Sequence, residues 1–457
     1  MLRWQYAHKR VDMKAYGIDF GSTNSLVSYY DGGSVRVLPI ETDGSKIIRS
    51  VIYVHPQKGK LVGKMAIDAY LDDVSRGEPL KLIEHFTGKY IKIPKPGDGF
   101  VGMITVPQII MIESGNRGRL IQGLKSLLTS DFSGTDLFGE HHTLEDLLSI
   151  ILGEMKMRAD KLVGENVKNV VLGRPVRYVG KANEKLAMDR MRNVALKAGF
   201  ENVEFELEPI GAALSYGKTT QKEEVVLVFD FGGGTLDISI VSYPSGQILG
   251  VSGVGIGGDL IDIHIFQNKL LKYFGGQSKF GLHKQHLPKF IVNALQNWYT
   301  LTLLKTQDFL ETLERLTQQT DDKVSMKNLE SLVLYNLGFA LYEEIDRVKK
   351  QLSYSNQENF SFNQQSIQIN EALTRLDLQE IMYPLLVQIE DCVNESIKVS
   401  GLKVSEIDKV VMTGGSSLIP RVKEILAAKF GTEKISEFDV FESVVTGLGI
   451  KSSQLWP

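Results

Sequence analysis

Two segments of the chain combine an apolar run, an acidic residue and a glycine turn in the same order. Residues 225–235 read VVLVFDFGGGT, and residues 16–23 read YGIDFGST. A run that is apolar throughout is typical of a strand buried on both faces, and an aspartate at its end needs a partner. The repeated pattern therefore predicts two similar strands that deliver Asp19 and Asp230 to equivalent turns.

The segments that follow these two turns also resemble each other. After Asp19 come SLVSYYDGGSVRVLPI and IIRSVIYVH, which are short alternating or apolar runs separated by Asp-Gly turns. After Asp230 comes LDISIVSYPSGQILGVSGVG, which is again broken by a turn, Pro-Ser-Gly. Both patterns predict strands joined by tight turns. We therefore expect a duplicated architecture, with a first lobe over residues 13–220 and a second lobe over residues 221–457.

Helical patterns lie between and after the predicted strands. An apolar face at helical spacing runs from Leu144 to Met155, and a second helix is expected from Asn183 to Lys197. The stretch of about 277–342 is mostly helical and has no counterpart in the first half, so it predicts a helical subdomain inserted in the second lobe. A C-terminal helix is expected to return toward the first lobe, and the first dozen residues to form an extension.

Composition limits the classes of partner. The 457 residues are 43% apolar and 23% charged, as in ordinary globular proteins of more than one domain. The net charge of −3 leaves no broad basic surface, so we expect no nucleic-acid partner. The single cysteine excludes an internal disulfide, and neither a signal peptide nor a membrane-length apolar run is evident. We therefore expect a cytoplasmic protein, without a membrane partner, that is a monomer.

The repeated motif also has a chemical meaning. Gly232, Gly233 and Gly234 carry no β-carbon, so the N–H groups of this turn can approach a ligand closely. Such a turn attracts phosphate, whereas Asp230 beside it repels phosphate unless a divalent cation lies between them. An acid next to a glycine turn therefore predicts Mg²⁺ with a nucleotide. Taken alone, either motif fits a simple tight hairpin about equally well.

Two further segments supply candidate binding residues. VVMTGGSSLIP, at 410–420, places a glycine turn before a helix, whose N-terminal N–H groups would suit an anion or a ribose. The helical segment LYEEIDRVKKQLS places Asp346, Lys349, Lys350 and Ser353 on one face. On its own, that second pattern fits a solvated charged surface better than a binding site.

Taken in order, these motifs resemble a known family. GIDFGSTNS, FDFGGGTLDISI, IGGDLID, DRVKKQLS and VVMTGGSSLIPRV are similar to the nucleotide-binding motifs of the seventy-kilodalton heat-shock chaperones, in the actin and hexokinase-like superfamily. The resemblance runs from about Lys14 to Ile450. It implies an α/β, two-lobed actin-like ATPase with duplicated, ribonuclease H-like mixed sheets and flanking helices. It also implies ATP or ADP as the nucleotide, Mg²⁺ as the metal, and an unidentified protein partner or client.

The resemblance further assigns roles to single residues. It implies that Asp19 and Asp230 hold Mg²⁺ through its water ligands, and that Lys125 and Glu208 act beside the attacking water. Without this context, Lys125 would be read as a surface lysine and Glu208 as a helix cap. The implied catalytic residues are Lys125, Glu208, Asp230, Thr235 and Asp237. The implied nucleotide-binding residues are Gly21, Ser22, Thr23, Asn24, Gly232, Gly233, Gly234, Thr235, Gly257, Gly258, Asp259, Asp346, Lys349, Lys350, Ser353, Gly414, Gly415 and Ser416.

The chain also departs from the family pattern. Ile210 and Gly211 follow the Glu-Pro pair where threonine and alanine are usual, and Asp346 stands where glutamate is common. The sequence ends where the family continues into a linker and a peptide-binding domain, so we expect a chaperone-like ATPase without that domain. Three alternatives stay open: a non-hydrolysing, actin-like assembly protein, a small-molecule kinase of the same superfamily, and a nucleotide sensor that releases no phosphate.

Overall fold

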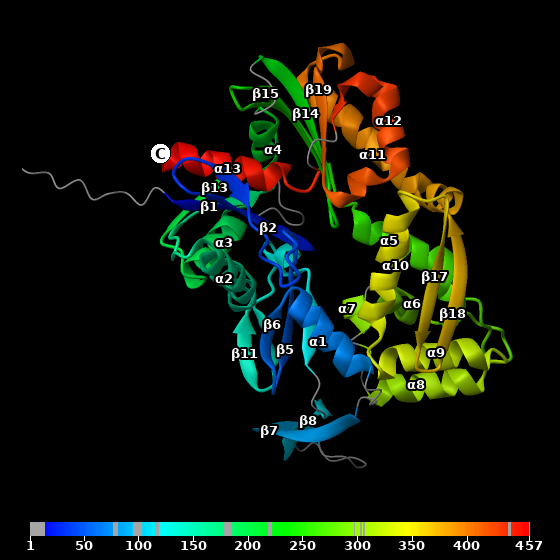
Figure 1. Cartoon of the computed structure of the whole chain (residues 1–457). Coiled ribbons are helices and arrows are strands. Elements are labelled where there is room, and N and C mark those ends of the chain that lie inside the picture. Colours follow the sequence, from blue (N-terminus) through cyan, green and yellow to red (C-terminus); the bar gives the residue numbers. More distant parts are fainter. Residues whose placement is uncertain are drawn as a thin grey trace, which may run out of the picture.

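A computed structural model gives the fold of the chain (Figure 1). The described residues are 14–75, 81–94, 103–114, 118–176, 184–217, 222–296, 298–301, 304, 307–436 and 440–456. The expected N-terminal extension and the expected lobe boundary at residues 220 and 221 lie outside these ranges, as does Asn183, the expected start of a helix. Among the helices that can be examined, none is long and apolar enough to cross a membrane.

The first large sheet holds the first acidic turn. Its central strand, β1, runs parallel to β12 and antiparallel to β2, and it is buried almost throughout. Helices α2 (Leu144–Val163) and α3 (Glu184–Lys197) pack against each other beside this sheet. The strand order is β13 (Asn202–Leu207), β12 (Asn169–Arg174), β1 (Ala15–Phe20), β2 (Asn24–Tyr30) and β3 (Val35–Val37), with β4 (Ile48–Arg49) paired to β2.

The second large sheet repeats this arrangement around the second acidic turn. Its strand β14 runs antiparallel to β15 and parallel to β19, as β1 does to β2 and β12. Helix α11 (Arg375–Ser400) covers β15 and β16, and α12 (Pro420–Phe430) packs against α11. The strand order is β16 (Gln247–Val254), β15 (Leu236–Tyr243), β14 (Glu224–Phe231), β19 (Lys409–Thr413) and β20 (Ile435–Ser436). The predicted fold class, with duplicated mixed sheets, is therefore confirmed.

Two helices lie between the large sheets and hold them together. Helix α13 (Ser443–Leu455) packs on β1, β2 and helix α4 (Glu208–Tyr216), and α4 in turn contacts β14 and β15. Figure 1 shows α13 passing beside β1 and below α4. The buried side chains at this junction come from both sheets and both helices, and they include Val171, Ala212, Val228 and Leu448. Burial of this apolar surface stabilises the contact between the first half of the structure, built around the first large sheet, and the second half, built around the second large sheet.

Helices and one hairpin form the outer part of the second half. The hairpin of β17 (Gln357–Gln364) and β18 (Ile367–Thr374) alternates buried and exposed residues and packs against α9, α10 and α11. The sequence analysis did not predict this hairpin. The helices in this part of the described chain are α5 (Gly258–Ile265), α6 (Lys289–Leu295), α7 (Trp298–Leu301), α8 (Gln307–Gln318), α9 (Lys323–Leu334) and α10 (Gly338–Leu352).

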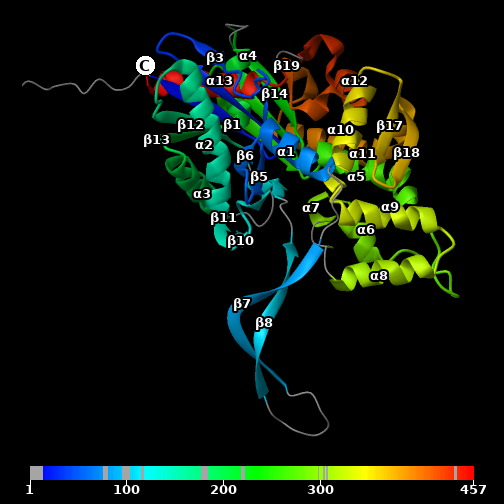
Figure 2. The ribbon, with the colours of Figure 1, turned by 60° about the horizontal axis from the view of Figure 1, so that its bottom comes forward.

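A long hairpin projects from the first half. Its strands β7 (Lys81–Pro94) and β8 (Met103–Ser114) pair only with each other among the described strands, and Figure 2 shows them reaching away from the rest of the chain. The sequence analysis did not predict it. It is inserted between helix α1 (Lys64–Ser75) and the last strand of the sheet formed by β6 (Gly59–Val62), β5 (Val51–His55) and β9 (Arg119–Gln122). A smaller hairpin, β10 (Gly134–Leu137) and β11 (Glu140–Thr143), leads into α2.

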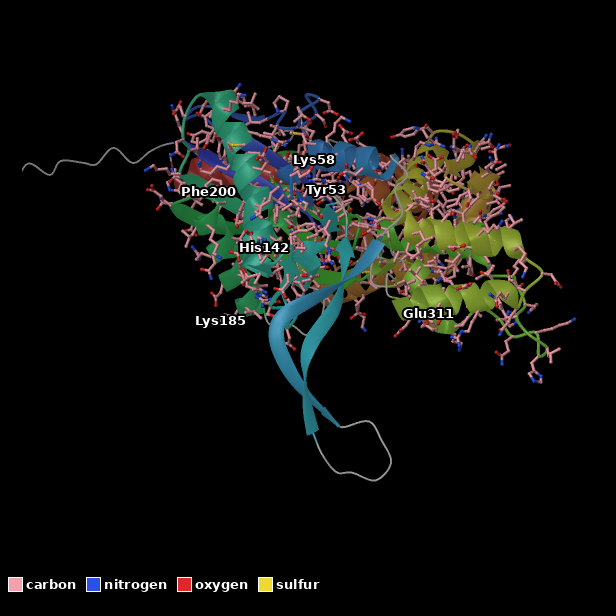
Figure 3. The ribbon with its side chains drawn as sticks, turned by 90° about the horizontal axis from the view of Figure 1, so that it is seen from below. Tyr53, Lys58, His142, Lys185, Phe200 and Glu311 are labelled. Carbon is pink, nitrogen blue, oxygen red and sulfur yellow. The ribbon has the colours of Figure 1, made fainter. Side chains whose placement is uncertain are left out.

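Hydrogen bonds tie both ends of this insertion to one tyrosine. The Tyr53 hydroxyl donates to Asp73 Oδ2 at 2.6 Å, near the end of α1, and accepts from the Gly118 N–H at 2.9 Å, just before β9. Lys58 Nζ donates to the other oxygen of Asp73 at 2.8 Å. Figure 3 shows Tyr53 and Lys58 close to the base of the projecting hairpin.

Candidate nucleotide site

The two acidic turns have the same geometry and face each other. The Gly21 N–H donates to the Asn24 carbonyl at 3.1 Å, and the Gly232 N–H donates to the Thr235 carbonyl at 3.0 Å. A β-carbon at position 233 would lie 2.6 Å from Thr23 Oγ1, so the two turns touch. Glycine at 233 therefore permits the close approach of two turns that belong to different sheets.

A cavity of about 850 Å³ lies where these turns meet. A cavity of this size falls within the range that holds small-molecule ligands and cofactors. All the residues that the sequence analysis proposed for catalysis, metal binding and nucleotide binding line this cavity, except Gly257. The structure thus brings together side chains from strands, turns and helices that are far apart in the sequence.

Four acidic side chains, Asp19, Glu208, Asp230 and Asp237, meet in this cavity beside Lys125. Asp230 lies directly opposite Asp237 in the β14–β15 pair, and Thr235 Oγ1 donates to Asp237 Oδ2 at 2.8 Å. Lys125 Nζ donates to Glu208 Oε1 at 3.1 Å. Lys125 comes from a 3₁₀ turn at Leu124–Leu127, and Glu208 begins helix α4. The pairing therefore depends on the packing of two separate elements.

Burial makes the ionised form of these carboxyls costly. Burial, with a smaller contribution from the charge of Glu208, raises the pKa of Asp19 to about 7, although Lys125 opposes the shift. The same two causes raise the pKa of Asp230 well above its usual range. Burial also raises the pKa of Asp237 to about 6, against the hydrogen bond from Thr235. A cation between these groups would offset the cost of keeping them charged.

The loop before helix α5 supports the glycine turn. The Gly258 N–H donates to the Gly232 carbonyl at 3.0 Å, and the Asp259 N–H donates to the Gly233 carbonyl at 2.8 Å. A β-carbon at position 257 would lie 2.2 Å from the Gly233 oxygen. Gly257 thus lies against the turn outside the cavity, whereas Gly258 and Asp259, which hold the turn through their N–H groups, line the cavity.

The charged face of helix α10 forms one wall of the cavity. Asp346 pairs with Lys349 at 3.1 Å and with Lys350 at 2.6 Å. Lys349 is buried, and its Nζ also lies 2.8 Å from Asp262 Oδ1 and donates to the Gly258 carbonyl at 3.1 Å. Burial is the largest single influence on Lys349 and opposes its charge, but the attraction of Asp262, Asp346 and Asp259, together with the hydrogen bond to Asp262, outweighs burial and raises its pKa. Ser353, at the C-terminal end of α10, also lines the cavity.

The third glycine turn closes the cavity from the β19 side. Gly414 has a φ of 79°, which favours glycine, and a β-carbon there would lie 2.5 Å from the Phe231 oxygen. Ser416 Oγ donates to the Gly232 carbonyl at 2.9 Å. Gly414, Gly415 and Ser416 therefore lie against the second acidic turn and share the cavity with it.

Several cavity residues were missed by the sequence analysis. Arg49 of β4 forms an ion pair with Glu343 of α10 and lies 4.0 Å from Asp346, so it connects the two halves across the cavity. Asp262 follows Asp259 by three residues in IGGDLID, a helical spacing from which it could have been found. No local pattern marks Arg49, because its partner lies on a distant helix.

The donor set fits a magnesium-bound nucleotide. Mg²⁺ usually keeps several water ligands and takes one or two carboxylates, which Asp19 and Asp230 can supply. The touching turns offer backbone N–H groups on two sides, as phosphate binding requires. Within the described ranges, no cluster of three or more His, Cys, Asp or Glu side chains has the geometry to hold a metal ion by protein ligands alone.

Comparisons with known proteins point to one family. A family model described as Hsp70 protein matches residues 129–297 and 311–457, which is more than half of the chain. The Chaperone protein DnaK of one Thermus thermophilus strain is 25% identical over 453 residues, which cover 97% of this chain and 61% of that protein. The Chaperone protein DnaK of a second strain of this species gives the same identity and coverage. The chain thus spans about 61% of the length of these curated relatives.

Proposed function

The chain belongs to the Hsp70 protein family, and from this membership and the cavity geometry we propose that it binds Mg·ATP and hydrolyses it to ADP and phosphate. The observation that carries the proposal is the meeting of Asp19 and Asp230 in one cavity, at the ends of equivalent strands of two separate sheets. A hairpin that used its aspartate only to cap a turn would have no reason to face a second such hairpin.

The chain's own residues supply what phosphoryl transfer to water requires. The bound magnesium nucleotide supplies the phosphoanhydride that is cleaved. Asp19 and Asp230 position the metal, and the N–H groups of the two turns hold phosphate oxygens. Lys125, kept beside Glu208 at 3.1 Å, places a positive charge where negative charge develops. Asp237 accepts from Thr235 and, with its pKa of about 6, can take up a proton near neutral pH.

We further propose that the nucleotide state changes the relative position of the two halves. The cavity is lined by both halves, and the Arg49–Glu343 pair connects them, so a ligand that contacts both turns favours the closed arrangement. The relatives are named as chaperone proteins. We therefore propose that a protein partner binds to a surface that changes when the two halves close.

Calorimetric titration with ATP, with and without Mg²⁺, followed by a phosphate-release assay, tests the proposal. We expect metal-dependent binding and slow release of phosphate, both lost in Asp19→Asn and Asp230→Asn. Binding without phosphate release would instead favour a nucleotide sensor or an assembly protein, and ATP-dependent light scattering separates those two. Unchanged phosphate release in both variants would exclude the proposed metal site.

A further inference from the structure

The cavity contains a buried hydrogen-bond acceptor that no described group of the protein satisfies. In the part of the chain that the structure describes, four buried side-chain atoms have no hydrogen-bond partner: Arg49 Nε, Gln122 Oε1, Asp262 Oδ1 and Ser443 Oγ. The first three belong to residues that line the cavity. Arg49 and Asp262 nevertheless reach oppositely charged groups, Glu343 and Lys349. Among the described residues, Gln122 Oε1 has neither a hydrogen bond nor a charge partner.

Gln122 is connected through the fold to the first acidic turn on one side and to Lys125 on the other. Gln122 is the last residue of β9, where it pairs with Val51 of β5. The residue before Val51, Ser50, donates its N–H to the Thr23 carbonyl at 2.9 Å, so this sheet is attached to the turn. After Gln122 the chain turns at Gly123, with a φ of 73°, into the 3₁₀ turn that carries Lys125.

The neighbouring residues of β9 make this polar side chain notable. Leu120 is buried in the large hydrophobic cluster to which both halves contribute, and Ile121 packs against the cluster of the first half. Gln122 interrupts this apolar sequence. A buried acceptor without a partner costs free energy in the folded state, so its presence at a ligand cavity points to a partner that arrives with the ligand.

The chemistry of the carboxamide oxygen limits what that partner is. Phosphate oxygens are acceptors, as are the carboxylates of Glu208 and of an ionised Asp19 that binds the metal, so none of them satisfies Oε1. The partner has to donate. Beside a triphosphate and a lysine, the donor that the proposed reaction itself requires is the attacking water.

We propose that Gln122 is a positioning residue for hydrolysis, accepting a hydrogen bond from the attacking water and directing the water oxygen toward the γ-phosphorus. The inference rests on the proposed function. As the water oxygen bonds to phosphorus, the bond from phosphorus to the β–γ bridging oxygen breaks and its electron pair leaves with ADP. The water protons pass to the released phosphate and to a nearby acceptor. The carboxamide takes no proton and acts through orientation alone.

The test uses Gln122→Met, which keeps the length of the side chain and removes the acceptor, in the full chain. The rate of phosphate release is measured in a single turnover from prebound Mg·ATP. We expect it to fall by roughly 10- to 100-fold, because a misplaced nucleophile reacts that much more slowly. Two further readouts do not depend on turnover: the Kd for Mg·ADP is expected within about 2-fold of the native value, and the apo Tm unchanged or higher, since the variant removes an unsatisfied acceptor.

The matched control is Gln368→Met, an exposed glutamine on β18 that does not line the cavity. It is expected to match the native chain in all three measurements. A single-turnover rate for Gln122→Met within about 2-fold of native would overturn this inference alone. A parallel loss of ADP affinity and Tm would assign Gln122 a structural or phosphate-binding role and overturn it as well. A native chain that binds Mg·ATP and releases no phosphate would overturn the proposed function and this inference together.

Discussion

The hydroxyl of Tyr70, on helix α1, donates a hydrogen bond to the main-chain carbonyl of Asn336, which lies just before helix α10. The Tyr70 ring meets Phe339 edge to face at 5.4 Å, and Phe339 meets Trp298 in the same way at 5.2 Å. All four residues line the cavity, and Tyr70 belongs to the first half while the others belong to the second. A contact between α1 and α10 therefore has to separate before the two halves can move apart.

Removal of the Tyr70 hydroxyl is expected to speed nucleotide release. Tyr70→Phe keeps the ring contact with Phe339 and removes the hydrogen bond to Asn336, whose net contribution is on the order of 1 kcal/mol. We expect ADP release to accelerate by about 3- to 10-fold, measured by stopped flow with a fluorescent ADP. Tyr354→Phe, at an exposed position outside the cavity, is the control. Equal release rates in the two variants would show that the hydroxyl does not hold the cavity closed.

The stability of the ligand-free protein is expected to fall as pH rises. The pKa of Asp19 is about 7 in the folded protein against 3.8 ordinarily. Between about pH 4 and pH 7 the folded chain therefore holds a proton that the unfolded chain has lost, so raising the pH favours unfolding. Asp19→Asn removes this contribution, and we expect its Tm, without nucleotide or metal, to exceed the native value by roughly 2–5 °C at pH 8.

The size of that gain should itself depend on pH. It is expected to shrink as the pH is lowered toward about 5, where Asp19 of the native protein is protonated and resembles asparagine. Thermal unfolding across this range gives the comparison, with Asp391→Asn, at an exposed position on α11, as the control. A Tm gain that is constant between about pH 5 and pH 8 would contradict a raised pKa for Asp19.

Because the two turns are in contact, an alanine substitution at position 233 is expected to weaken nucleotide binding more than one at position 234. A β-carbon at 233 would lie 2.6 Å from Thr23 Oγ1, whereas a β-carbon at 234 has no neighbour within 4 Å. Gly233→Ala therefore has to push the turns apart, and we expect it to weaken Mg·ATP binding by about 10-fold or more. The Kd of Gly234→Ala for Mg·ATP is expected to be at least about 5-fold lower than that of Gly233→Ala. Calorimetric Kd values of equal size would argue against close contact of the turns.

The projecting hairpin is expected to be dispensable for nucleotide binding. Because β7 and β8 pair only with each other among the described strands, replacing residues 81–114 with a short Gly-Ser turn leaves both large sheets intact. We expect the Kd for Mg·ATP to stay within about 3-fold of native. In contrast, Tyr53→Phe breaks the hydrogen bonds to Asp73 and Gly118 at the base of the hairpin, and it is expected to lower the Tm relative to the native chain. A hairpin deletion that abolished binding would show that the insertion supports the cavity.

Local patterns in the sequence were enough to predict the two acidic turns and the duplicated architecture, whereas the fold class came from the resemblance to the heat-shock chaperones. An apolar run that ends in Asp-Phe-Gly specifies a buried strand and a tight turn by short-range preferences, and its repetition specified the duplication. The two hairpins β7–β8 and β17–β18 were missed. In the second of these, Phe360 and Phe362 are buried where α10 and α11 pack against the hairpin, a contact that no local pattern encodes.

The sequence by itself determined which residue types stand at each turn, because glycine, aspartate and hydroxyl residues act there through their own backbone and side-chain chemistry. Only the tertiary structure decided which distant residues meet, namely Arg49 with Glu343 and Tyr70 with Asn336. It also supplied the hydrogen bond between Lys125 and Glu208, which the family resemblance had placed only beside the same water. It also decided the raised pKa of Asp19, since burial and neighbouring charge come from elements distant in the chain. Proximity between distant segments follows from the packing of whole sheets and helices, and no single segment contains that information.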